Sequence, residues 1–196
     1  MTTTRSTSTE SGNNCAFSAI RVDGTVSLWG DLDYGYGGSG QYTRFPLDLK
    51  NIIQIYSNER GFYAIRKDGM VFADYLVGSG PNADISQILY KDVADKLVNI
   101  VAISTTRMNV AALTSSGAVI YFGSKDTSSV SVNPRLQKGV IKVFTTADAF
   151  AALKNDGSVV VWGIPYGAGN DGEVYGYLES GVVDIVSTGD KGHLEN

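Results

Sequence analysis

The hydrophobic positions of this chain form short apolar runs that occur in pairs, and a tight polar turn joins the two runs of each pair. In residues 149–163, Ala149–Leu153 precede the dipeptide Asp156-Gly157, and Val159–Trp162 follow it. An Asp-Gly turn between apolar runs predicts a β-hairpin, because such turns need backbone with positive φ. The pattern occurs four times, which predicts a repeat architecture. The turn glycines are Gly24, Gly69, Gly117 and Gly157.

Aromatic and aliphatic residues recur at fixed offsets from each turn glycine. These offsets define columns of equivalent residues, and the glycines are 45, 48 and 40 residues apart. A period of about 40–50 residues is typical of the four-stranded blades of β-propellers. We expect the columns to be structural anchors, with the tryptophans packed in the core or between blades. Besides the glycines, the anchors are Phe17, Trp29, Phe62, Phe122, Phe150 and Trp162.

A third apolar block precedes three of the hairpins and also follows the last one. The blocks are residues 52–57, 98–104, 140–145 and 182–187, and the first three keep a constant distance from the hairpin that follows. The first hairpin has no such block before it, and the last block has no hairpin after it. Pairing of this C-terminal strand with the first blade would satisfy both ends and remove exposed sheet edges. We expect this closure within one chain, with closure between chains, in a dimer or filament, as the alternative.

These patterns together predict an all-β, propeller-like ring of four four-stranded blades. The ring would form a single domain at residues 15–188, with units at about 15–57, 58–105, 106–145 and 146–188. A Thr/Ser-rich tail (1–14) and a polar tail (189–196) would flank it. A chain of 196 residues is long enough for one sizeable core. A dimer that pools eight blades fits the same count.

Composition and charge exclude several classes of function. The net charge of −4 argues against nucleic-acid binding, which needs a basic face. No apolar stretch approaches the roughly 20 residues of a membrane span. Met1–Asn14 lacks the apolar segment of a secretory signal, so we expect a cytoplasmic protein or one exported by a non-classical route. Cys15 is the only cysteine, which excludes an internal disulfide and favours a small buried side chain.

Few residues suit catalysis or metal binding. The only histidine, His193, lies in the polar tail, which argues against a triad of nucleophile, histidine and acid. Asp31 and Asp33 resemble only the start of a calcium loop, because the later oxygen ligands are missing. Asp171 and Glu173 allow a remote alternative, a carboxylate-dependent hydrolase, although carboxylates in a Gly-rich loop ordinarily serve solubility. We therefore expect no metal, no cofactor and no enzymatic activity.

Recognition by loops is the function that remains. The two longest loops are rich in glycine and tyrosine, and a tyrosine offers both an apolar face and a hydroxyl group. We expect these loops to bind a protein partner or a second copy of the chain, with lectin-like stacking on sugars as the alternative. The candidate binding residues are Tyr34, Tyr36, Tyr42, Tyr166, Asp171, Tyr175 and Tyr177.

The stretches Asp23–Gly30 and Asp156–Gly163 share the pattern Asp-Gly-x-Val-x-x-Trp-Gly. This pattern resembles the repeats of the regulator-of-chromosome-condensation type, strongly in the first and fourth units and weakly in the second and third. The resemblance covers residues 15–188 and implies a β-propeller closed by an exchanged strand. Propellers of this family usually have more blades than this chain can supply, and the Gly-Gln-Leu-Gly segment that commonly follows Trp-Gly is absent. Some relatives are nucleotide-exchange factors that act through inserted loops; no segment here matches one, so that activity is not carried over.

Overall fold

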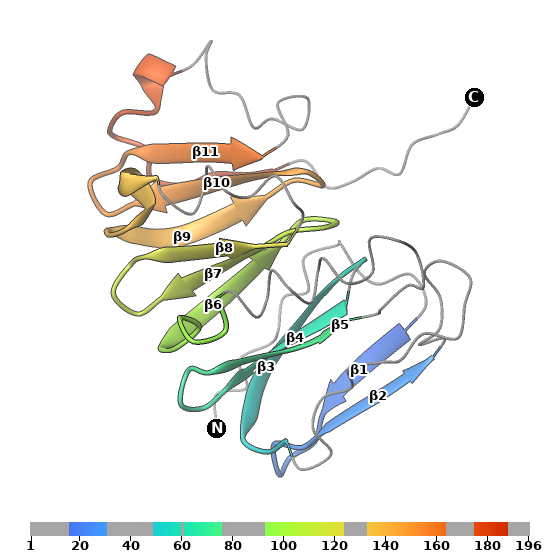
Figure 1. The fold of residues 1–196 in the computed structure, drawn as a ribbon. Helices are drawn as coiled ribbons and strands as arrows, with labels where there is room; N and C mark the ends of the chain where they lie inside the picture. Colours follow the sequence, from blue (N-terminus) through green and yellow to red (C-terminus); the bar gives the residue numbers. More distant parts are fainter. Residues whose placement is uncertain are drawn as a thin grey trace, which may run out of the picture.

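A computed structural model describes residues 16–30, 49–59, 61–75, 93–123, 133–163 and 175–187. In these ranges the chain is all-β apart from two single 3-10 turns, η2 (Pro134–Leu136) and η4 (Tyr175–Tyr177). The strands form four antiparallel sheets, which we call blades 1 to 4 in chain order (Figure 1). Blade 1 holds β1 (Ala16–Ile20) and β2 (Val26–Gly30), blade 2 holds β3 (Ile52–Asn58), β4 (Gly61–Arg66) and β5 (Val71–Tyr75), blade 3 holds β6 (Ile100–Thr105), β7 (Val110–Thr114) and β8 (Val119–Phe122), and blade 4 holds β9 (Val140–Thr145), β10 (Ala149–Lys154) and β11 (Val159–Gly163).

The blades follow one another along a curved stack, with blade 1 at one end and blade 4 at the other (Figure 1). The first strands of blades 2, 3 and 4 lie along the same side of the stack, because β3 contacts β6 and β6 contacts β9. We call β3, β6 and β9 the inner strands. The all-β, propeller-type fold predicted from the repeats is therefore confirmed.

Each blade is built around one of the predicted hairpins. The turn glycines have φ between 76° and 81°, a left-handed conformation that residues with a Cβ rarely adopt. In three turns the aspartate before the glycine accepts a hydrogen bond from the backbone N–H two residues on, as Asp156 does from Ser158 at 2.9 Å. The third turn has Ser116 instead, whose hydroxyl pairs with that of Thr114 at 3.0 Å.

The inner strands keep one register in all three blades that have them. Ile55 pairs with Ala64, Ile103 with Ala112, and Val143 with Ala152. The aligned blocks read from the sequence are thus confirmed as strands at residues 52–58, 100–105 and 140–145.

A repeated junction holds each blade to the next. The first N–H of each inner strand donates to the carbonyl of the preceding turn glycine, for example from Val140 to Gly117 at 3.0 Å. The residue just before that N–H is left-handed, with φ of 60° at Asn51 and 77° at Gly139. The two backbones approach so closely that a Cβ at any of the four turn glycines would lie within 2.7–2.9 Å of the next junction. Glycine is therefore required at these turns both by φ and by space.

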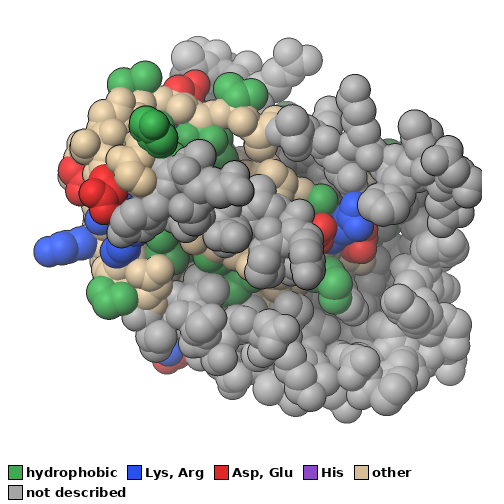
Figure 2. All heavy atoms as spheres, turned by 90° about the horizontal axis from the view of Figure 1, so that it is seen from above, with side chains coloured by type: hydrophobic (Ala, Val, Ile, Leu, Met, Phe, Trp, Pro, Cys, Tyr) green, Lys and Arg blue, Asp and Glu red, His purple; other side chains and the backbone are tan. Residues whose placement is uncertain are grey.

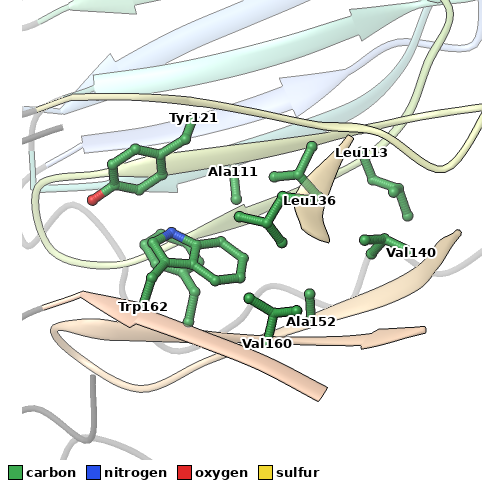
Figure 3. Close-up of a cluster of buried hydrophobic side chains, with 10 residues drawn as sticks. Ala111, Leu113, Tyr121, Leu136, Val140, Ala152, Val160 and Trp162 are labelled. Carbon is green, nitrogen blue, oxygen red and sulfur yellow. The ribbon is translucent and has the colours of Figure 1, made fainter. Parts of the chain in front are cut away.

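The core consists of three apolar layers, one between each pair of neighbouring blades. A leucine ahead of each inner strand is buried in each layer: Leu49, Leu97 and Leu136. In the layer between blades 3 and 4, Leu136 lies between Leu113 of β7 and Val160 of β11 (Figure 3). Stability therefore depends on packing between blades, as expected for repeats that cannot bury an apolar face alone.

Closure of the ring within one chain is not confirmed. The segment Val182–Ser187 begins like the inner strands, with the Val182 N–H donating to Gly157 at 3.0 Å, but it forms no strand, and Val183 and Val186 are each 91% exposed. Among the described residues, β1 pairs with β2 alone. The four blades turn through only part of a circle, which leaves blade 1 and blade 4 at opposite ends (Figure 1).

The sheets also have two or three strands where we expected four. Each hairpin ends far from its turn, whereas the next inner strand starts beside that turn. The predicted fourth strands fall between these two points, on residues 31–48, 76–92, 124–132 and 164–174, which lie outside the described residues. The two predicted tails, residues 1–14 and 189–196, lie outside them as well.

Candidate protein interface

Aromatic rings form the contact between blades 3 and 4. Phe150 and Trp162 stack in parallel, with ring centroids 5.1 Å apart and 6° between their planes. Tyr121 of blade 3 meets both rings edge-on, with centroids at 5.4 Å and 6.2 Å. Figure 3 shows Tyr121 and Ala111 of blade 3 facing Trp162 of blade 4. Edge-to-face and offset stacked rings are favourable arrangements, and all these rings are buried.

The same columns meet at the other two blade contacts. Between blades 2 and 3, Tyr63 lies edge-on to Phe122 with centroids 6.0 Å apart. Between blades 1 and 2, Phe62 packs in one cluster with Leu28. We call the side that carries the Phe150 and Trp162 columns the front face of a blade, and the side that carries the Ala111 and Tyr121 columns its back face. Every internal contact therefore joins the back face of one blade to the front face of the next.

Blade 1 has an uncovered front face. Phe17 and Trp29 occupy the columns of Phe150 and Trp162 and stack at 5.5 Å with 19° between their planes. No described blade precedes them, and the two side chains are 63% and 50% exposed. Trp162 thus packs between blades as expected, whereas Trp29, which we expected there too, is half-exposed.

Blade 4 has an uncovered back face, and an apolar groove of about 180 Å³ lies on it. Ala151 and Val161 line the groove in the columns that Ala111 and Tyr121 occupy in blade 3. Phe144 of β9 lines one side, and Ile185 and Val186 of the C-terminal segment line another. The groove is therefore the back half of a blade contact without a front half against it.

A third apolar surface lies along the turn end of the blades, and we call it the turn-end rim. It is defined by exposed residues in the hairpin turns, in the junctions and at the second position of each inner strand. In each inner strand the register slips at this second position, so that a bulge leaves its side chain outside the pairing. The turn-end rim comprises Val22, Ile53, Met70, Val98, Val101, Ile141 and Val183.

Charged groups stand among these apolar residues. The Arg66 guanidinium, at 2.6 Å, hydrogen-bonds to Asp68 and holds the pKa of that carboxyl below its ordinary value. Hydrogen bonds from Thr25 and Ser158 lower the pKa of Asp23 and Asp156 in the same way. The turn carboxylates therefore stay ionised at the surface. Figure 2, which looks onto the blade 4 end, shows hydrophobic side chains interspersed with acidic and basic ones.

Most of the binding residues predicted from the sequence lie outside the described part of the chain. Tyr34, Tyr36, Tyr42, Tyr166 and Asp171 fall there, together with Cys15, Asp31, Asp33, Glu173 and His193. Of the two remaining tyrosines, Tyr175 is described in its backbone only, and both belong to η4. Tyr177 is 82% exposed and so stands free for contact.

The described ranges contain no group of three or more His, Cys, Asp or Glu residues that could hold a metal ion. They also contain no helix with the length and hydrophobicity needed to cross a membrane.

Sequence reasoning missed the turn-end rim, although a signal for it exists. Each inner-strand block places two apolar residues in succession at the blade junction, such as Ile52-Ile53 and Val140-Ile141. In a regular strand adjacent side chains point to opposite faces, and both faces of an internal blade are covered, as the buried neighbours Phe62 and Tyr63 show. The repeated apolar pair therefore marks the blade junction, whereas the exposure of its second residue comes from the bulge.

Comparison with known proteins supports the fold and goes no further. No family model matches the chain, and no curated protein sequence matches it. Among solved structures, human WBSCR16 is similar with a TM-score of 0.51 and 19% identity, over 76% of this chain and 45% of that one. Yeast RCC1 (Prp20), in a structure with Kap60 bound, is similar with a TM-score of 0.51 and 15% identity, over 86% of this chain and 46% of that one.

These similar structures are longer than the present chain. The chain spans less than half of the length of either protein. At such identities the likeness establishes the propeller-type fold alone. It does mean that the curved stack of four blades matches part of a larger propeller.

Proposed function

We propose that this chain is a non-enzymatic protein-binding module of the regulator-of-chromosome-condensation repeat type, and that a protein partner binds along the turn-end rim. One observation carries the proposal: the exposed aliphatic residue at the bulge of every inner strand. Ile53, Val101 and Ile141 hold this position in blades 2, 3 and 4. Exposed apolar side chains gathered on one rim are typical of interaction surfaces.

The charged residues of the turn-end rim also suit protein binding. Protein interfaces commonly have an apolar centre with charged and polar residues around it. On the turn-end rim, ionised carboxylates such as Asp23 and Asp156 stand beside the aliphatic row, and Arg66 is held in place by Asp68. The yeast RCC1 (Prp20) structure, which contains Kap60, is an example of a propeller-type protein with a protein bound. We propose that the Gly/Tyr-rich loops, including the exposed Tyr177, add contacts around this rim.

The test compares rim variants with a variant at the opposite end of the blades. Val101→Glu and Ile141→Glu place charges on the turn-end rim, and both side chains are exposed, so the fold should persist. Met108→Glu places the same charge in the loop between β6 and β7, away from the turns. Circular dichroism of all three variants checks folding.

The measurement is quantitative mass spectrometry of proteins cross-linked to the immobilised chain. A true partner is recovered with the wild type and with Met108→Glu, and is reduced at least tenfold with both rim variants. Equal recovery with the rim variants would refute the proposal. A glycan array run in parallel addresses the lectin alternative, which would gain support from sugar binding that Tyr177→Ala abolishes.

A further inference from the structure

The two ends of the blade stack carry the two halves of a contact that occurs three times inside the chain. Blade 1 presents an uncovered front face, Phe17 and Trp29, and blade 4 presents an uncovered back face, Ala151 and Val161. In the internal contact between blades 3 and 4, residues in these same columns bury each other completely. The two end faces are therefore complementary, because every internal contact joins a back face to a front face in the same way.

The backbone is complementary at the same place. Among the described residues, β1 has one paired edge and lacks the inner strand that blades 2 to 4 possess. Val182–Ser187 starts as an inner strand, and it pairs with no hairpin among the described residues. The register shared by the inner strands places Ile185 opposite Ala19 and Ser187 opposite Phe17, as Val143 lies opposite Ala152 and Thr145 opposite Phe150.

The two halves do not meet within one chain. Blade 1 and blade 4 lie at opposite ends of the stack (Figure 1), and the stack matches less than half of the length of larger propellers. A second copy of the chain supplies both a front face for blade 4 and an inner strand for blade 1. It presents them in the same relative positions as the internal blade contacts do. An unrelated partner would have to reproduce an aromatic front face and a free strand edge together.

We propose that a second copy of this chain docks head to tail, so that Val182–Ser187 of one copy pairs with β1 of the other. The front face of blade 1, Phe17 and Trp29, then fills the groove beside Val161 of the neighbouring copy. The contact is heterologous, because two different surfaces meet, and two copies can make it twice and close into one ring. The proposal extends the proposed function by naming one partner, yet its two apolar surfaces, the front face of blade 1 and the groove beside Val161, lie outside the turn-end rim.

The first measurement is the mass in solution by sedimentation equilibrium over a range of concentrations. The proposal predicts a species of twice 20.9 kDa, or a series of larger multiples if the contacts stay open. A monomer at all accessible concentrations overturns it, including a monomer closed upon itself.

Two variants each block one half of the contact. Phe17→Glu puts a charge on the uncovered front face, and Met108→Glu, which puts the same charge on an exposed apolar residue between β6 and β7, is its control. Val186→Pro removes an N–H that should point at β1. Val186 is the equivalent of Phe144 in β9. The carbonyl of Val143, the residue before Phe144, accepts a hydrogen bond from Ser104 of blade 3 and so points away from β10. Backbone groups alternate in direction along a strand, so those of Phe144 point at β10. Val186→Ala keeps the N–H and is the matched control.

The expected result is that Phe17→Glu and Val186→Pro are monomeric. Met108→Glu should self-associate like the wild type, and Val186→Ala, which loses only a side chain that lines the groove, should still form the dimer, though more weakly. An equimolar mixture of Phe17→Glu and Val186→Pro should recover a dimer, because one intact head meets one intact tail. A Val186→Pro variant that remains associated by itself overturns the head-to-tail contact. Every copy of that variant lacks an intact C-terminal segment, so its association would have to use another pair of surfaces. The rim variants Val101→Glu and Ile141→Glu should self-associate normally, so failure of this proposal is distinguishable from failure of partner binding.

Discussion

The junction between blades 3 and 4 allows a paired test of why glycine occupies the turns. Gly117 and Gly139 face each other there with nearly equal backbone conformations, φ of 81° and 77°. A Cβ on Gly117 would lie 2.9 Å from the backbone nitrogen of Gly139. A Cβ on Gly139 would meet only side-chain atoms, of which Asn155 Oδ1 is nearest at 3.0 Å and can move away.

The magnitudes follow from these two environments. An alanine in the left-handed region costs about 1 kcal/mol at either position. Gly117→Ala must in addition push the junction apart and weaken the hydrogen bond from the Val140 N–H to the Gly117 carbonyl, a further loss of about 0.5–1.5 kcal/mol. We therefore expect about 1.5–2.5 kcal/mol for Gly117→Ala and about 1 kcal/mol for Gly139→Ala. Gly139→Asn should cost less still, because Asn51 and Asn99 hold the equivalent position at φ of 60° and 56°.

Urea unfolding followed by circular dichroism measures these differences. With a slope of about 2 kcal/mol per molar urea, the midpoint should fall by about 0.8–1.2 M for Gly117→Ala and by about 0.5 M for Gly139→Ala. Equal losses in the two alanine variants would refute the reasoning, because the close backbone approach would then contribute nothing.

Two further predictions concern packing and pH. Trp162→Ala should cost about 3–5 kcal/mol because the ring is 5% exposed, whereas Trp29→Ala in the same column should cost about 1–2 kcal/mol; urea midpoints that shift equally would contradict this. The turn carboxylates of Asp23, Asp68 and Asp156 have lowered pKa values in the folded protein, so they stabilise it above pH 3.8, and that stabilisation is lost as the pH falls through their folded pKa values. The triple Asp→Asn variant should lose melting temperature less steeply than the wild type below about pH 4, and parallel curves would contradict the assignment.

The features that could be predicted from the sequence are those set by local periodicity. The hairpins follow from Asp-Gly turns between apolar runs, and the inner-strand register follows from the constant distance between Val143 and Phe150 and its equivalents. These contacts lie close in sequence and repeat, so each copy supports the interpretation of the others.

Local periodicity does not predict whether the ring closes. Whether four blades make a circle depends on the angle between neighbours, and that angle is set by how side chains of different size pack across each layer. Phe17–Trp29 and Phe150–Trp162 are the same residue pair in the same columns, yet one pair is exposed and the other buried. The difference is that a neighbouring blade covers Phe150–Trp162, whereas no described blade covers Phe17–Trp29. No local sequence pattern predicts this.

The repeated junction between a turn glycine and the next inner strand also bears on how this architecture can change. The junctions at Gly24, Gly69 and Gly117 join each blade to the next through a backbone hydrogen bond, so the placing of the blades does not require a fixed length of chain between a hairpin and the next inner strand. The unequal spacing of the turn glycines shows that this length already differs from one unit to the next. Foreign peptides grafted between a hairpin and the next inner strand should leave the stack intact, which makes the chain a scaffold on which new recognition loops can be displayed.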